Sequence, residues 1–321
     1  MTRVTLAGMS GWARRDFVRA AAAAAAAVVA RPGGAAGNPR SGFAGTVCLF
    51  SKHLPDLDAA LLGRAVKALG FGGVDLTVRP GGHVPPERAA PDLPRFLAAL
   101  RDEGLEVPMI TTAIVSASEA TARPILETAG RHRVPFFKPG YYRYRFADVR
   151  QEIAAAAADL RGLAALGAEC GIALGYHNHA GYIGGPVWDL APAIDGLDPR
   201  WAGYYFDVRH ATAEGGAGGW RSALDLAAPR LKMVAIKDFF WEKAASGWRQ
   251  RNCPLGLGMV DWKTFWAALA RAAFAGPVSL HLEYEIAGGS AAARQDATLA
   301  AAARDLAFLK ARLAEAYGAA S

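Results

Sequence analysis

The sequence predicts an α/β fold, a closed parallel (β/α)8 barrel of the TIM-barrel class. Short apolar segments alternate with helical ones from residue 46 onward, in eight units of about 35 residues, as such a barrel requires. The alternative is an open doubly wound sheet, but no Gly-x-Gly-x-x-Gly motif opens a helix after the first strand. The expected strands are 46–50, 73–77, 106–111, 134–138, 172–176, 202–207, 232–237 and 277–283.

Helix-ending signals support the segments expected between these strands. Gly70, Gly104 and Gly171 each follow a helical segment, as glycine does where a helix ends in a left-handed residue. Asp261 precedes another segment and is a good N-cap. The expected helices are 57–69, 93–103, 118–131, 148–170, 189–197, 222–228, 262–273 and 294–317.

Residues 1–42 are predicted to be an export signal and linker, and residues 43–321 the barrel domain. Arg14-Arg15-Asp16-Phe17 precedes an alanine- and valine-rich stretch at 20–30. A basic segment before a short apolar one is typical of a secretory signal, and the paired arginines resemble a twin-arginine signal. The alternative is a surface helix or a disordered arm. About eleven apolar residues are too few to span a bilayer, so we expect a periplasmic or secreted protein without stable membrane insertion after signal cleavage.

Charge and cysteine content argue against several classes of function. The formal net charge is +7, but residues 1–40 hold six arginines and one aspartate and so account for +5 of it. The rest of the chain has no concentrated basic run, so we expect no nucleic-acid partner. Cys48, Cys170 and Cys253 form no Cys-x-x-Cys motif and are expected as isolated thiols.

Two histidines follow the fifth expected strand and mark the candidate site. Because side chains alternate along a strand, His177 and His179 are expected on the same face. Imidazoles at the end of an apolar strand suit a metal or acid–base site, with two satisfied loop histidines as the alternative. Nearly every other expected strand also ends in polar residues, and in a barrel those ends surround the active site.

Metal ligands and catalytic groups are expected among these strand-end residues. His177, Asp207 and His281, or Glu283, combine imidazole with carboxylate, which suits a divalent cation such as Mn, Zn, Co or Mg. Lys237 leaves an apolar strand and is expected to polarise a carbonyl or stabilise an enolate; its alternative is an ion pair with a neighbouring carboxylate. Glu283 is the expected acid/base residue, with a ligand or rim salt bridge as the alternative.

Polar and aromatic residues after the other strands are expected to bind substrate. Trp241 and Trp248 would form a stacking wall for a sugar ring, or simply close a loop. Lys138, together with Arg79, would suit an acidic substrate. The residues expected to bind substrate are His83, Lys138, His210 and Trp241.

Five short motifs follow one another in order along the second half of the chain. They are Gly-Tyr-His-Asn-His at 175–179, Phe-Asp-Val-Arg-His-Ala at 206–211, Ile-Lys-Asp at 236–238, Pro-Leu-Gly-Leu-Gly-Met-Val-Asp-Trp at 254–262 and Gly-Pro-Val-Ser-Leu-His-Leu-Glu at 276–283. Together they resemble the sugar phosphate isomerase/epimerase superfamily of xylose-isomerase-like TIM barrels, over about residues 46–317. The resemblance implies a divalent metal at the strand ends and an activity that interconverts sugars, ketoses or inositol derivatives, or that eliminates or hydrates keto-sugars.

The motifs depart from the pattern that the resemblance implies. A glutamate ligand is implied where His177 stands, a histidine where Ala235 stands and a glutamate where His281 stands. Asp207 is retained, and His179 keeps the residue of the pattern and is expected on the substrate side of the site. The departures concern the metal and the proton-shuttling glutamates, and leave the expected fold unchanged.

We therefore expect an exported carbohydrate-active enzyme, an isomerase or epimerase of a sugar or keto-sugar that works through an enediolate with help from a metal. Its expected catalytic residues are Glu283, Lys237 and His179. The alternatives are a keto-sugar lyase or hydratase on the same barrel, and a non-catalytic sugar-binding protein. A metal-dependent endonuclease is disfavoured because the chain after residue 40 has almost no excess basic charge. A small-molecule sugar is the expected partner, and a homo-oligomer stays open.

Overall fold

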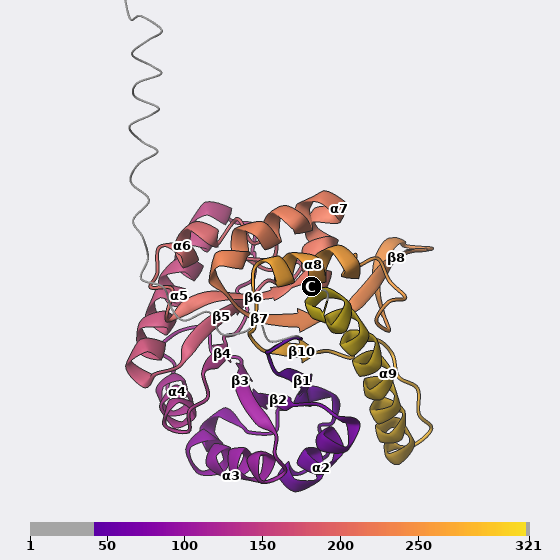
Figure 1. Ribbon diagram of the computed structural model, residues 1–321. Coiled ribbons are helices and arrows are strands. Elements are labelled where there is room, and N and C mark those ends of the chain that lie inside the picture. The colour runs from indigo at the N-terminus through magenta and orange to yellow at the C-terminus, as the bar shows by residue number, and fades with distance from the viewer. Residues whose placement is uncertain (1–41, 319–321) are drawn as a thin grey trace, which may run out of the picture. The chain divides into compact units, whose positions relative to one another are not determined.

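The computed structural model describes residues 42–318, which form a closed barrel of eight parallel strands. The strands follow one another around the barrel in the order β1-β10-β7-β6-β5-β4-β3-β2, with helices around the outside (Figure 1). The predicted (β/α)8 fold is confirmed, and each barrel strand overlaps the segment expected for it. The barrel strands are β1 (Val47–Phe50), β2 (Gly73–Val78), β3 (Glu106–Thr112), β4 (Phe136–Lys138), β5 (Ala173–His177), β6 (Ala202–Asp207), β7 (Leu231–Ile236) and β10 (Val278–Leu280).

Local capping interactions explain where several helices begin and end. Asp58, Asp148 and Asp261 are N-caps whose carboxylates each accept a hydrogen bond from a backbone N–H three residues further on. Gly70 and Gly171 end α2 and α5 in the left-handed conformation, with φ of 87° and 72°, as the sequence predicted. The helices are α2 (Ala59–Leu69), α3 (Ala89–Asp102), α4 (Ala122–Arg131), α5 (Val149–Cys170), α6 (Ala191–Asp195), α7 (Val208–Ala227), α8 (Trp262–Arg271) and α9 (Ala291–Gly318).

Helix α7 differs from the prediction of a short helix at 222–228. It begins directly after β6 because the Asp207 carboxylate caps it, accepting a hydrogen bond from the backbone N–H of His210 at 2.9 Å. Gly216, with φ of 61°, interrupts the regular helix. His210 lies in the first turn of this helix.

The barrel interior changes from apolar to polar along the strands. Met109, Tyr205, Met233 and Ala235 form a small buried cluster inside the barrel, separate from the main core between strands and helices. Side chains that face the barrel interior recur at every second residue of a strand. Two residues after Met109 on β3, Tyr205 on β6 and Ala235 on β7, the inward-facing side chains are polar. Those side chains belong to Thr111, Asp207 and Lys237, and all three are buried.

A two-stranded hairpin between β7 and α8 was missed by the sequence analysis, which read this segment as a loop. Its strands, β8 (Asp238–Ala244) and β9 (Gly247–Cys253), pair antiparallel and form a sheet of their own outside the barrel. Most of β9 is exposed and polar, so it lacks the apolar alternation by which strands are recognised. In Figure 1, β8 lies outside the ring of barrel strands, and two residues of β9, Gln250 and Asn252, contribute to the cavity described below.

Asp238, at the start of this hairpin, fixes the segment that leads into α8. Its buried carboxylate accepts hydrogen bonds from the backbone N–H groups of Gly256, Gly258 and Val260, and from the indole of Trp262 at 2.9 Å. A Cβ at Gly258 would lie only 2.1 Å from an Asp238 oxygen, so glycine is required for this close approach. The carboxylate thus organises a loop of the barrel mouth.

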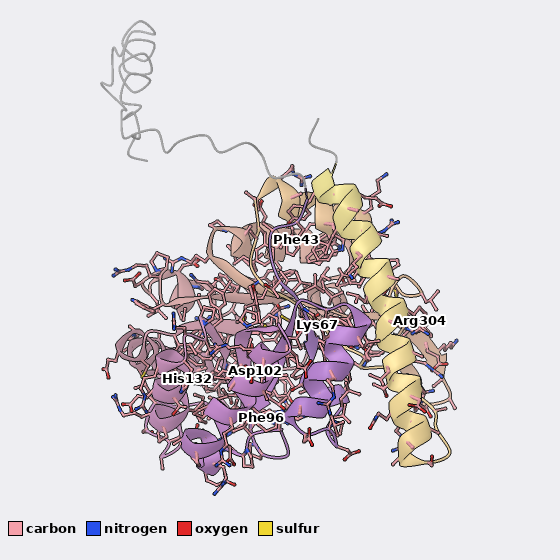
Figure 2. All side chains as sticks on the ribbon, turned by 60° about the horizontal axis from the view of Figure 1, so that its bottom comes forward. Phe43, Lys67, Phe96, Asp102, His132 and Arg304 are labelled. Carbon is pink, nitrogen blue, oxygen red and sulfur yellow. The ribbon has the colours of Figure 1, made fainter. Side chains whose placement is uncertain are left out.

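The two ends of the described chain meet on one side of the barrel. The ring of Phe43 packs edge-on against Tyr317 near the end of α9, with centroids 5.0 Å apart (Figure 2). In the described part of the chain, none of the helices combines the length and apolar character that crossing a membrane requires. The predicted export signal lies outside the described residues, and its boundary with the barrel domain stays a prediction.

Asp238→Ala is expected to lower the free energy of unfolding by about 3 kcal/mol, because several buried donors lose a charged acceptor at once. Urea denaturation followed by circular dichroism measures this. Asp102, an exposed carboxylate at the end of α3, supplies the control (Figure 2). Asp102→Ala should change stability by no more than about 0.5 kcal/mol. Equal effects of the two substitutions would contradict a structural role for Asp238.

Candidate active site

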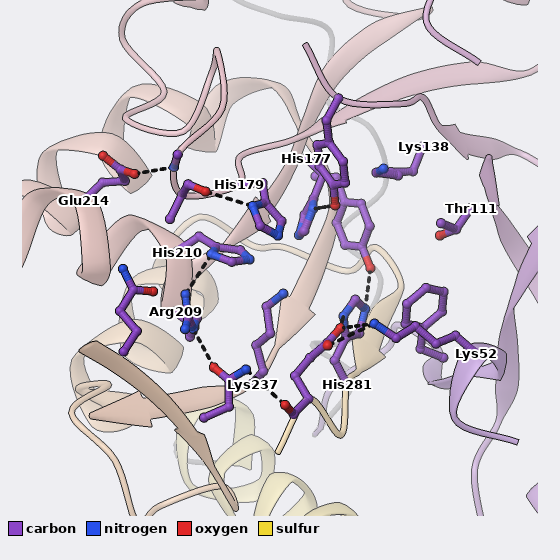
Figure 3. Close-up of a pocket in the computed structure, with 18 of the residues that line it drawn as sticks. Lys52, Thr111, Lys138, His177, His179, Arg209, His210, Glu214, Lys237 and His281 are labelled. Atoms are coloured by element: carbon purple, nitrogen blue, oxygen red, sulfur yellow. Dashed lines mark hydrogen bonds and ion pairs between the residues drawn. The ribbon is translucent and has the colours of Figure 1, made fainter. Parts of the chain in front are cut away.

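A cavity of about 590 Å³ lies where the barrel strands end, at the carboxyl end of the barrel (Figure 3). Its wall combines residues at or just after the ends of all eight barrel strands with Gln250 and Asn252 of the β8–β9 hairpin. Barrel enzymes place their chemistry at this end of the strands. The charged and imidazole side chains of the wall are Lys52, Arg79, Lys138, His177, His179, Arg209, His210, Glu214, Lys237, His281 and Glu283.

A buried ion pair between Lys237 and Asp207 forms the centre of this wall. The Lys237 ammonium lies 3.1 Å from Oδ2 of Asp207, and both side chains are buried. Burial alone would raise the pKa of Asp207, but the Lys237 charge and the neighbouring His210 and His177 outweigh it and hold that pKa well below its usual range. Asp207 is therefore a carboxylate at any ordinary pH.

The position of Asp207 is fixed by its backbone as well as by its side chain. The amide of Asn178, at the end of β5, accepts a hydrogen bond from the Asp207 N–H at 2.7 Å and donates one to the Asp207 carbonyl at 3.0 Å. Oδ1 of Asp207 is engaged as the N-cap of α7, which leaves Oδ2 for Lys237 and the imidazoles. The carboxylate is thus pre-organised before any ligand binds.

His177 links this ion pair to Tyr141. Its Nε2 lies 3.1 Å from Asp207 Oδ2, and because the carboxylate can only accept, Nε2 carries the proton. Nδ1 is then an acceptor, and the Tyr141 hydroxyl donates to it at 2.7 Å. Burial lowers the pKa of His177 well below its usual value despite the carboxylate, so the imidazole is neutral. Tyr141, His177 and Asp207 form one chain of hydrogen bonds, of which Tyr141 and His177 line the cavity.

His210 presents an N–H group toward the same carboxylate. The Arg209 guanidinium lies 3.0 Å from its Nδ1, and because arginine only donates, Nδ1 must accept and the proton of the neutral ring is on Nε2. Nε2 is buried, has no hydrogen-bond partner among the described residues, and lies 3.9 Å from Asp207 Oδ2. Burial and the charge of Lys237 lower the pKa of His210 and keep the ring neutral. His210 is therefore a hydrogen-bond donor at the cavity.

His179 has the opposite character. Its Nδ1 lies 3.0 Å from the carbonyl of Ala180, so Nδ1 is the donor and the Nε2 lone pair is left free. Burial, followed by the charge of Lys237, lowers its pKa to about 4, which keeps it neutral. The rings of His179 and His210 lie 3.9 Å apart between centroids. An acceptor imidazole and a donor imidazole thus stand side by side.

Glu283 follows β10 and lines the same cavity. Both of its carboxylate oxygens accept hydrogen bonds from Lys52, at 2.8 and 2.9 Å, and His281 Nδ1 lies 3.8 Å from Oε1. Burial would raise the pKa of Glu283, but His281, Lys237 and Lys52 together lower it below its usual range. Glu283 is therefore an ionised carboxylate paired with an ammonium group.

Below His281, a second buried carboxylate forms the floor of the barrel mouth. Asp75 accepts hydrogen bonds from Thr111 at 2.7 Å, Ser279 at 2.8 Å and Tyr205 at 3.3 Å. Nε2 of His281 is in hydrogen-bond contact with the Ser279 and Tyr205 hydroxyls, at 3.1 and 3.2 Å. His281 is thereby engaged in a network separate from that of Asp207.

The donor set at Asp207 does not fit a divalent cation. In the described residues, no group of three or more His, Cys, Asp or Glu side chains is placed to hold a metal ion. His177 and His210 both present protonated Nε2 atoms to Asp207, and a metal-bound histidine must instead present a lone pair there and donate through its other nitrogen. The other nitrogen of His210 faces a guanidinium, which cannot accept. The Lys237 ammonium already occupies Asp207 Oδ2.

The structure brings most of the expected site residues together. Of the expected metal ligands, His177 and Asp207 are in contact, whereas His281 belongs to the Asp75 network. Two expected substrate-binding residues, His83 and Trp241, do not line the cavity. The residues that do line it are Glu283, Lys237, His179, Lys138, His210, His177 and His281.

His83 and Trp241 have other roles in the structure. The ring of His83 makes hydrogen-bond contacts with the Thr77 hydroxyl and the Leu54 carbonyl, each at 3.1 Å, and so ties two loops together. Trp241 projects from β8 and packs edge-on against Phe239, with its side chain partly exposed. The hairpin reaches the cavity through Gln250 and Asn252 of β9, whereas Trp248 of the same strand, the other expected stacking residue, is exposed and does not line the cavity.

Tyr141, Arg209 and Asn178 were not selected from the sequence although they control the protonation of the site. Tyr141 lies just after the end of a strand, which is the position by which the other site residues were recognised. Arg209 and Asn178 adjoin selected residues, and only the three-dimensional contacts show what they bond to. Their importance depends on partners distant in sequence, which a strand-end pattern does not reveal.

Comparison with known proteins decides the family. Residues 64–312 match the model of the family described as xylose isomerase-like TIM barrel. The chain belongs to this family. No curated protein matches the chain. The superfamily indicated by the strand-end motifs is thereby confirmed at the level of the fold and family.

Solved structures of similar fold include sugar epimerases. An L-ribulose 3-epimerase shares 17% identity, with a TM-score of 0.63 over 85% of this chain and 95% of that one. The 3-keto-D-glucoside 4-epimerase of E. coli shares 16% identity, with a TM-score of 0.63 over 83% and 99% of the two chains. A xylose isomerase-like TIM barrel protein from Mycobacterium smegmatis, solved in complex with magnesium, shares 17% identity, with a TM-score of 0.64 over 85% and 97%. At these identities the likeness concerns the fold.

The donor set predicts that purified protein holds no stoichiometric Mn, Zn, Co or Mg. Elemental analysis measures the content, and the midpoint of thermal unfolding should be unchanged by chelator or by added metal, because a bound ion would stabilise the folded state. A rise of the midpoint with added Mn that disappears in Asp207→Asn would contradict this prediction and restore Asp207 as a ligand.

Proposed function

We propose that this chain is an isomerase or epimerase of a sugar or keto-sugar that works through an enediolate. The observation that carries the proposal is the pair of neutral imidazoles beside Lys237: His179 with a free lone pair and His210 with an N–H. Removing a proton next to a carbonyl needs an acceptor for the proton and donors for the oxygen that becomes negative. The cavity offers both, in a family whose fold sugar epimerases share.

In the proposed first step, His179 Nε2 takes the proton from the carbon next to the substrate carbonyl. The electron pair of that C–H bond forms the carbon–carbon double bond of the enediolate, and the carbonyl electrons move to oxygen. The ammonium of Lys237 and the N–H of His210 donate to this oxygen, which lies in a desolvated site where such donors act strongly. Asp207 keeps Lys237 and His177 in place and takes no proton itself.

The second step returns a proton from the opposite side of the cavity. The Lys52 ammonium, held by the ionised Glu283 carboxylate, donates this proton to carbon, and the proton that His179 took passes to water, which reprotonates Lys52 and restores both groups. Glu283 with Lys52 comes from β10 and β1, whereas His179 follows β5, so the two groups approach a bound substrate from different directions. A proton delivered to the other face of the same carbon gives an epimer, and one delivered to the adjacent carbon gives an isomer. Loss of a β-substituent from the enediolate gives a lyase, which product analysis of the same reaction distinguishes.

His179→Gln is expected to lower kcat by about 10²–10⁴-fold, because the variant lacks the general base. The test follows a panel of keto-sugars by NMR in deuterated water, where proton removal appears as exchange of the substrate C–H. His132→Gln, a surface substitution at the end of α4, is the matched control and should leave the rate unchanged (Figure 2). Normal exchange in His179→Gln would remove this residue from the mechanism.

Glu283→Gln is expected to separate the two steps. Because His179 is intact, deuterium should still exchange into the substrate, whereas net epimerisation or isomerisation should fall by about 10²-fold or more. The exposed Glu285, two residues further on, provides the control Glu285→Gln. Loss of exchange and of net turnover to the same extent would show that Glu283, and not His179, removes the first proton.

We also propose that the enzyme is exported to the periplasm or secreted, on the basis of Arg14-Arg15 and the apolar stretch after it. Replacing both arginines by lysine should leave the full-length precursor in the cytoplasm. Cell fractionation and the intact mass of the wild-type protein test this. An unprocessed wild-type protein found only in the cytoplasm would contradict the proposal.

A further inference from the structure

Lys138 is a buried cation without a partner. It ends β4 with 3% of its surface exposed and lines the cavity, with Nζ 3.4 Å from the centroid of the Tyr141 ring (Figure 3). Among the described residues, no hydrogen bond or ion pair is made by its ammonium group. Burial, followed by the charge of Arg79, lowers its pKa well below the usual value. Burying a charge in this way is unfavourable unless a ligand supplies an acceptor.

Arg79 is a second cation on the same side of the barrel. It follows β2, two strands from Lys138, lies over the ring of Phe50 at 5.5 Å and lines the same cavity. No carboxylate within the described residues pairs with it. Thr111, on the strand between them, also lines the cavity.

The other carboxylates of the site are already engaged. Glu283 pairs with Lys52, and Asp207 pairs with Lys237. Glu214, the remaining carboxylate of the cavity wall, lies on α7 and accepts a hydrogen bond from the Gly181 N–H at 2.7 Å. The oxygens of Asp75, which does not line the cavity, accept hydrogen bonds from three hydroxyl groups and form no ion pair with Lys138. The β2–β4 side of the cavity is therefore lined by two basic side chains and by no carboxylate.

We propose that Lys138 and Arg79 form an anion subsite that binds the carboxylate of an acidic sugar, so that the substrate of this site is a keto-sugar acid. The reaction of such a substrate rests on the proposed function, whereas the binding of its carboxylate at this subsite does not. A planar carboxylate can receive both prongs of the Arg79 guanidinium and one N–H of Lys138. Across the cavity, the rest of the substrate would reach Lys237 and the two imidazoles.

Calorimetry with three probes tests the subsite: glucuronate, its neutral counterpart glucose, and glucose 6-phosphate. Glucuronate should bind about tenfold more tightly than glucose or more, since hydrogen bonds to charged groups are among the strong ones. Lys138→Met and Arg79→Gln should abolish this preference, and Lys138→Arg should keep much of it. Arg143→Gln removes an exposed cation outside this cavity and should change nothing. Circular dichroism of each variant verifies folding.

Equal binding of glucuronate and glucose by the wild-type protein would overturn the inference without any variant. Tighter binding of glucose 6-phosphate than of glucuronate would overturn the assignment to a carboxylate. Reduction with borohydride in the presence of a keto-sugar, followed by mass spectrometry, would overturn it if an adduct mapped to Lys138, because the amine would then be a nucleophile. Proton exchange into neutral keto-sugars without glucuronate binding would leave the proposed function intact while the subsite fails.

Discussion

The protonation pattern of this cavity depends on one buried ion pair, that between Lys237 and Asp207. Two charges withdrawn from water cost several kcal/mol each in desolvation, and only close pairing with further hydrogen bonds offsets that cost. The structure supplies them: Asn178 clamps the Asp207 backbone, α7 uses one carboxylate oxygen as its cap, and Lys237 takes the other. The pair joins β6 to β7, so the barrel itself sets its geometry.

The polar groups around that pair set the tautomers of three histidines. A fixed carboxylate forces the proton of His177 onto Nε2, and the guanidinium beside His210 forces its proton onto Nε2 as well. The carbonyl of Ala180 does the reverse for His179. Burial, followed by the charge of Lys237, lowers the pKa of His179 and of His210, so these imidazoles stay neutral although a carboxylate lies among them. Neutral rings with assigned donors and acceptors are suited to moving a proton.

The sequence was sufficient for the barrel but not for the pairing of its polar residues. Strands appear as apolar runs because both faces of a parallel barrel strand are buried, and this held for all eight. The exposed β8–β9 hairpin has no such signal and was missed. An ion pair was one of two interpretations of Lys237. Choosing between them required knowing that Asp207 ends the strand adjacent to β7. His83 had the residue type and position of a site residue, yet its ring is occupied by Thr77 and Leu54.

An ammonium group and a divalent metal ion place different demands on the residues around them. A metal needs several deprotonated ligands with lone pairs directed at one point, and each ligating imidazole needs an acceptor behind it. An ammonium needs one carboxylate and leaves the imidazoles free, and a guanidinium behind an imidazole then strengthens its N–H as a donor. Ala235 and Arg209 agree with the ammonium arrangement. Ala235 has no ligand atom to offer a metal, and Arg209 is a donor where a metal site requires an acceptor. The single charge of Lys237 is weaker than that of a metal, and in the proposed mechanism the N–H of His210 adds a second donor to the developing oxyanion.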